Sequence, residues 1–98
     1  MSNPVICDSD LEDIIPEYLD SKREECALLQ DLAKQGNFDE IRTRAHGMKG
    51  SGGCYGFSVI SEIGREMESA AKERNLAEVL AKVDALQSYL SQIEVRYE

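Results

Sequence analysis

The sequence predicts an all-α protein: an antiparallel up-down four-helix bundle with a short N-terminal helical extension broken near Pro16. Apolar residues recur at the helical spacing of about 3.6 residues. Capping residues followed three positions later by glutamate precede several of these apolar patterns. The β-branched alternation that is typical of strands is absent. Short connections between the helical segments favour the up-down order, and we expect a single domain over residues 1–98.

The first helical segment is expected over residues 10–35. Ser9 and Glu12 have the spacing of a capping box at its start. Pro16 lacks a backbone N–H and its ring crowds the preceding turn, so we expect the helix to break or kink near Ile15. The later part of this segment places the following apolar residues on one side: Leu19, Cys26, Leu29, Leu32 and Ala33.

Three more helices are expected, over residues 38–53, 57–73 and 76–96. Asn37 and Asn75 each stand three positions before a glutamate, which makes both pairs variants of the capping box. The apolar stripes of the last two helices are Ile60, Ile63, Met67, Ala70 and Ala71, and Val79, Val83, Leu86, Leu90 and Ile93.

The charge of the chain limits its partners. Nineteen acidic and eleven basic side chains give a net charge of −8, which argues against nucleic acid and against an anionic membrane surface. No run approaches the roughly 18 apolar residues that span a bilayer. The N-terminus is acidic and does not resemble a signal peptide, so the cytoplasm is the expected compartment. The basic patch of an otherwise negative chain consists of Arg42, Arg44 and Lys49.

The cysteines do not predict a metal site. Cys7, Cys26 and Cys54 are widely separated, and a zinc site would need all three with His46 at unusual spacings. We therefore expect no metal, and cysteines that pack as small apolar groups.

The glycine-rich stretch RAHGMKGSGGCYG, residues 44–56, could at first be taken for a nucleotide-binding loop. Gly47 and Gly52 have the required glycine spacing. However, Gly53 and Cys54 stand where that loop needs a lysine and a hydroxyl residue, and no strand precedes it. The stretch is better interpreted as a continuation of the second helix.

On that helix, one stripe faces the core and another faces outward at about 100° per residue. The core stripe is Ile41, Ala45, Met48 and Gly52, and the outer one is Arg42, His46, Lys49, Gly50 and Gly53. His46 should therefore point to solvent, where a neutral imidazole can act as a nucleophile. Lys49 can donate to phosphoryl oxygens, Arg42 adds positive field, and Gly50 leaves space for another protein.

Glycine is costly inside a helix. The four at Gly47, Gly50, Gly52 and Gly53 would together cost about 3–4 kcal/mol relative to alanine. This cost suggests that close approach matters here. Gly64, in the third helix, is expected to mark close helix packing. Ile15 is expected in the core, whereas Tyr18 could lie in the core or in an exposed docking patch.

The segment Ala45-His46-Gly47-Met48-Lys49-Gly50-Ser51, continuing to Gly56, resembles the signature of histidine-containing phosphotransfer (HPt) domains. The resemblance covers nearly the whole chain and implies a four-helix bundle that carries a phosphoryl group between aspartates of receiver domains. It implies that His46 accepts the group, Lys49 steadies it and Gly50 gives access. Gly53 would add to the space around the site, and Gly56 would permit close packing behind it. Gly52-Gly53 departs from the family pattern, which leaves the helix end open between residues 50 and 56.

The resemblance also implies partners and cofactors. The partners would be response-regulator receiver domains, a hybrid sensor histidine kinase, or both, in a two-component multistep phosphorelay. The chain itself would be a carrier without ATP-dependent kinase activity, a monomer without a cofactor of its own, and Mg²⁺ would belong to the receiver. An alternative function is a small acidic helical adaptor or inhibitor that binds a signalling protein without phosphoryl transfer. The dimerising half of a sensor kinase is disfavoured, because the chain has four helices instead of a long two-helix pattern and no ATP-binding domain.

Overall fold

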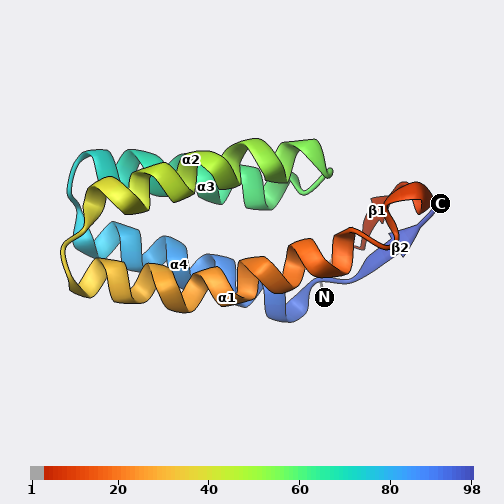
Figure 1. Ribbon diagram of the computed structural model, residues 1–98, viewed down its shortest axis with the longest axis horizontal. Coiled ribbons are helices and arrows are strands. Elements are labelled where there is room, and N and C mark those ends of the chain that lie inside the picture. The colour runs from red at the N-terminus through yellow and green to blue at the C-terminus, as the bar shows by residue number, and fades with distance from the viewer. Residues whose placement is uncertain (1–3) are drawn as a thin grey trace.

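A computed structural model describes residues 4–98 of the chain. Along the sequence it shows β1 (Val5–Cys7), a 3-10 helix (Ser9–Leu11), α1 (Ile15–Lys34), α2 (Phe38–Cys54), α3 (Ser58–Lys72), α4 (Leu76–Gln92) and β2 (Val95–Tyr97) (Figure 1). Successive helices run in opposite directions, with α2 and α3 side by side and α1 and α4 side by side (Figure 1). The predicted up-down four-helix bundle is confirmed.

Two asparagine side chains begin helices as the capping spacing predicts. Asn37 accepts the backbone N–H of Glu40 at 3.3 Å at the start of α2. Asn75 accepts the N–H of Glu78 at 3.1 Å at the start of α4. Each amide oxygen satisfies one of the backbone donors that a helix leaves unpaired at its N-terminus.

The start of α1 differs from the prediction. The chain does not form a helix from residue 10: Ser9–Leu11 is a 3-10 helix, and α1 begins only at Ile15. Pro16 lies in the first turn of α1, where its missing N–H would have no partner, so the helical path is broken just before Ile15 as predicted, and the 3-10 helix is the short N-terminal extension. The predicted capping box at Ser9 is wrong, because the side chain of Asp8 is the one that caps, accepting the N–H of Asp10 at 2.9 Å.

The two ends of the described chain pair as a small parallel sheet, which the sequence did not predict. Val5 lies opposite Val95 and Cys7 opposite Tyr97. The backbone of Ile93 is extended, so α4 ends at Gln92 instead of residue 96. The absence of β-branched alternation therefore did not exclude these two short strands. The strands tie both ends together at the end of the bundle that also holds the α2–α3 loop (Figure 1).

The core lies between the four helices. All the apolar residues expected on the inner faces of α1 and α3 are buried, as are those of α4 except the half-buried Ile93. Cys7 and Cys26 are buried, whereas Cys54 is exposed, so the expectation of packed cysteines is wrong for Cys54. No helix among residues 4–98 is long and apolar enough to cross a membrane.

Candidate functional site

His46 lies on the outer side of α2. The four residues predicted to face inward from α2, Ile41, Ala45, Met48 and Gly52, are all buried. The side chain of His46 is 67% exposed. The helical arithmetic thus predicted correctly that the imidazole faces solvent.

Two glycines bring the backbones of α2 and α3 into close contact beneath His46. A Cβ on Gly64 would lie 2.7 Å from the backbone N of Lys49 and 2.9 Å from the carbonyl oxygen of Ala45. A Cβ on Gly52 would lie 2.7 Å from the backbone N of Ser61. Because no side chain other than hydrogen fits at either place, these glycines set the distance between the two helices. The packing role predicted for Gly64 is confirmed.

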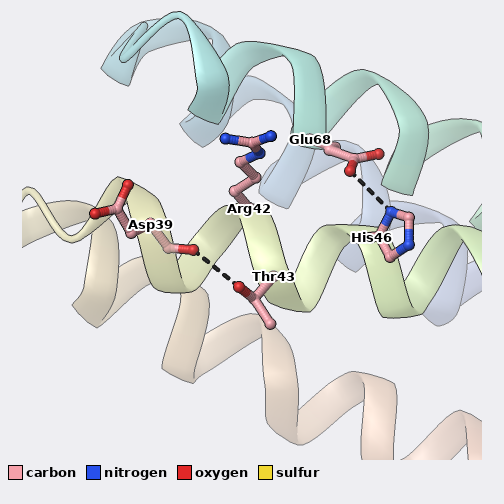
Figure 2. Close-up of a pocket in the computed structure, with 5 residues that line it drawn as sticks. All are labelled: Asp39, Arg42, Thr43, His46 and Glu68. Atoms are coloured by element: carbon pink, nitrogen blue, oxygen red, sulfur yellow. Dashed lines mark hydrogen bonds and ion pairs between the residues drawn. The ribbon is translucent and has the colours of Figure 1, made fainter.

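This close packing places Glu68 of α3 against the histidine. Glu68 lies one turn after Gly64, and its Oε2 is 2.9 Å from Nδ1 of His46 (Figure 2). Its other oxygen, Oε1, accepts a hydrogen bond from Nζ of Lys49 at 3.0 Å. One carboxylate therefore bridges the histidine and the lysine.

The charge of Glu68 determines which ring nitrogen of His46 is open. The hydrogen bond from Lys49 lowers the pKa of Glu68, and the hydrogen bond with His46 lowers it further. An ionised carboxylate can only accept hydrogen bonds, so Nδ1 of His46 carries the proton and donates it. In the neutral ring, Nε2 then holds a lone pair, and Figure 2 shows this nitrogen directed away from Glu68.

The hollow beside the imidazole is lined by Asp39, Arg42, Thr43, His46 and Glu68 (Figure 2). Thr43 donates to the backbone carbonyl of Asp39 at 3.2 Å, so its hydroxyl is engaged within α2. Arg42 extends towards α3 and makes no ion pair or hydrogen bond with the residues that the structure describes. It is therefore a free cation one turn from the histidine.

The other basic residue of the predicted patch, Arg44, lies elsewhere. Its guanidinium contacts Glu25 of α1 at 3.1 Å and Glu40 of α2 at 3.1 Å. Arg44 joins α1 to α2 and is not among the residues that line the histidine hollow. Of the predicted basic patch, Arg42 and Lys49 therefore lie near His46, whereas Arg44 forms ion pairs elsewhere.

The remaining glycines of the stretch have different environments. A Cβ on Gly50 would meet nothing within 4 Å, and one on Gly53 would meet only the hydroxyl of Ser61, at 3.7 Å. Gly56 also has open space around it but adopts a φ of +87° after the end of α2. The close packing expected at Gly56 is wrong: its glycine provides a left-handed turn, and Gly52 is the residue in close contact.

Tyr18, which the sequence left open between core and docking patch, is buried. Its hydroxyl is 2.9 Å from the hydroxyl of Ser51, and its ring stacks against Phe57 at a centroid distance of 6.0 Å. Ile15 is fully buried beside it, as predicted, while Ile14 is 45% exposed. Tyr18 of α1 therefore contacts the C-terminal part of α2 through Ser51.

Sequence reasoning did not identify Glu68. One signal was present, since Glu68 follows the packing glycine Gly64 by four residues and so lies on the same face of α3. Which residue of α2 it meets depends on how the two helices are aligned, which the sequence did not indicate. Among residues 4–98, no group of three or more histidine, cysteine, aspartate or glutamate side chains is arranged to hold a metal ion.

Comparison with known proteins gives one match. A family model described as Hpt domain matches residues 13–95, which covers all four helices and the site around His46. No curated protein and no solved structure shows significant similarity to the chain.

Proposed function

The chain belongs to the Hpt domain family, and from this membership we propose that it carries a phosphoryl group on His46 between receiver-domain aspartates in a two-component phosphorelay. The observation that best supports the proposal is the asymmetric imidazole. Its Nδ1 is held by Glu68 at 2.9 Å, while Nε2 points away from Glu68 on a side chain that is 67% exposed. Such an imidazole is oriented for attack by one defined nitrogen.

In the proposed step, the Nε2 lone pair of His46 attacks the phosphorus of an aspartyl phosphate on the receiver. The bond from phosphorus to the aspartate oxygen breaks, and its electron pair stays on the receiver carboxylate. The phosphorylated imidazole is then cationic and keeps its proton on Nδ1, where Glu68 accepts the hydrogen bond. The reverse attack, by an aspartate of a second receiver, passes the group on and restores the neutral ring.

The neighbours of His46 have proposed roles in this transfer. The hydrogen bond from Lys49 to Glu68 keeps the ammonium near the imidazole of His46. We propose that this ammonium also donates to phosphoryl oxygens. Arg42 adds positive charge without a competing acid partner among the described residues. Gly50 and Gly53 are proposed to ease access to the site, Gly50 more than Gly53, because an added Cβ would meet nothing within 4 Å at Gly50 but the hydroxyl of Ser61 at 3.7 Å at Gly53. The Mg²⁺ that supports phosphoryl transfer is proposed to reside on the receiver, and the chain to act as a monomer in the cytoplasm without kinase activity of its own.

Phosphoryl transfer from a phosphorylated receiver domain tests the proposal. The protein is incubated with a panel of receiver domains carrying labelled phosphate, and acid-labile, base-stable label on the chain is measured. We expect labelling of the wild-type chain and none in His46→Gln, with the helical circular dichroism of both unchanged. Label at the wild-type level in His46→Gln would refute the role of His46. Binding without label in either protein would instead favour the adaptor function.

A further inference from the structure

A second hollow continues from the histidine site along the line where α2 meets α3. It is lined by Arg42, Arg65, Glu68, Ser69 and Lys72. Arg42 and Glu68 belong to both hollows, so the two are contiguous. Lys72 lies one turn beyond Glu68 on α3, in the direction that leads away from the loop between α2 and α3.

The cations of this hollow are unusual in a chain with a net charge of −8. Most lysines and arginines are engaged: seven of the eleven form ion pairs, and Arg74 lies over the ring of Phe38. Within residues 4–98, the cations without such a partner are Lys34, Arg42 and Lys72. Two of these three line the hollow, and both are exposed.

We propose that Arg42 and Lys72 form a basic strip that docks the acidic rim of the receiver's phosphorylation pocket, on the side of His46 that faces the start of α2. This inference rests on the proposed function, because it assigns the contact surface of the same transfer. A receiver that brings an aspartyl phosphate, with further acidic side chains around it, is repelled by the negative chain as a whole. The basic strip offers it one local site of attraction next to the histidine, since Arg42 lines the same hollow as His46.

Charge complementarity of this kind acts mainly on association. Exposed charges steer the encounter of two proteins and fix their relative orientation, and salt screens the effect over about 10 Å at 0.1 M. Lys72 lines the second hollow but not the one that contains His46. Its removal should therefore weaken docking without changing the transfer step once the receiver is bound.

Rapid-mixing transfer measurements with Lys72→Glu, Arg42→Glu and Arg96→Glu test the strip. Arg96 is a matched control, because it is an exposed arginine in β2, at the opposite end of the molecule from Lys72. The probe is a phosphorylated receiver domain that labels the wild-type chain. At about 30 mM salt we expect Lys72→Glu to lower the second-order rate about five- to tenfold below that of Arg96→Glu, and Arg42→Glu to lower it at least as much. The transfer rate at saturating receiver should be unchanged in Lys72→Glu.

The salt dependence separates docking from misfolding. Raising the salt to about 0.5 M should reduce the difference between Lys72→Glu and Arg96→Glu to less than about twofold, and Lys72→Gln should show a smaller change in the same direction. Equal second-order rates for Lys72→Glu and Arg96→Glu would overturn the strip and leave the phosphotransfer function standing. If no receiver of the panel labels the wild-type chain, binding of the same receivers is measured by titration instead: a lower, salt-dependent affinity of Lys72→Glu than of Arg96→Glu would then support the docking strip while phosphoryl transfer is refuted.

Discussion

Glu68→Ala is the most informative change, because it removes a carboxylate that contacts His46 and Lys49 without touching the nucleophile itself. In the wild-type chain Glu68 fixes the proton of His46 on Nδ1 through a contact of 2.9 Å. In the variant, the ring is free to rotate and the proton can reside on either nitrogen. The positive charge that forms on the ring during transfer also loses the facing carboxylate.

The size of the effect follows from the exposure of the groups. A hydrogen bond to a charged group contributes about 1.5–3 kcal/mol. Since the histidine side chain is 67% exposed, we take the lower end, which corresponds to about a tenfold loss of transfer rate. The Lys49–Glu68 ion pair involves side chains that are 38% and 22% exposed, so its loss should cost at most about 1 kcal/mol of folding stability. The variant should stay folded and transfer slowly.

The assay is single-turnover transfer at saturating phosphorylated receiver, with urea unfolding measured in parallel. Glu66→Ala serves as control, since Glu66 lies on the same helix but contacts Lys82 of α4, at 3.8 Å. Glu68→Gln keeps an oxygen that can accept from Nδ1 but loses the charge, so about a threefold loss is expected. If Glu68→Ala transfers within about twofold of Glu66→Ala, the carboxylate does not position the ring and the reasoning is wrong.

Three further predictions concern the packing and charge around the site. In urea titrations, Gly64→Ala should lower the free energy of unfolding by about 3 kcal/mol, because its Cβ would lie 2.7 Å from the backbone N of Lys49. Gly47→Ala is the control in the same titrations: its Cβ would meet nothing within 4 Å, so the free energy of unfolding should rise by up to about 1 kcal/mol. Gly56→Ala should cost about 1–2 kcal/mol, because φ is +87°, and thermal unfolding would show it. Lys49→Met should raise the pKa of Glu68 towards its ordinary value in a carboxyl NMR titration, since the Lys49 hydrogen bond is the largest cause of the lowered pKa. The attraction between these two side chains is complete above the ordinary carboxyl pKa and is lost as the pH falls through the lowered one, so an unshifted pKa in Lys49→Met would contradict this pairing.

The helices were predictable because their signals are local. Asn37 and Asn75 cap within three residues of themselves, and the apolar stripes depend only on the helical period. The predicted second helix, 38–53, ends one residue before α2 does. The predicted third helix, 57–73, extends one residue beyond α3 at each end. Local rules therefore suffice where the interactions that make a helix lie within one turn.

The ends of the chain were not predictable in this way. β1 and β2 have three residues each and are separated in the sequence by all four helices, with Val5 opposite Val95. Three residues are too few to show alternation, and the partner strand lies at the other end of the sequence. The predicted last helix, over residues 76–96, consequently includes Val95 and Arg96 of β2.

The site shows the same division between local and long-range information. The exposure of His46 follows from its position on one helix, but its contact with Glu68 depends on how two helices, α2 and α3, are aligned. The glycines of α2, taken together from the sequence, suggested that close approach matters here, and Gly50 alone was expected to leave space for another protein. In the structure Gly52 and, from α3, Gly64 permit close approach between α2 and α3 themselves, while Gly50 remains open towards solvent. Gly52 and Gly64 thus cost helical stability but bring α3 close enough for Glu68 to reach the imidazole, whereas Gly50 leaves the surface of α2 one turn after His46 without a side chain.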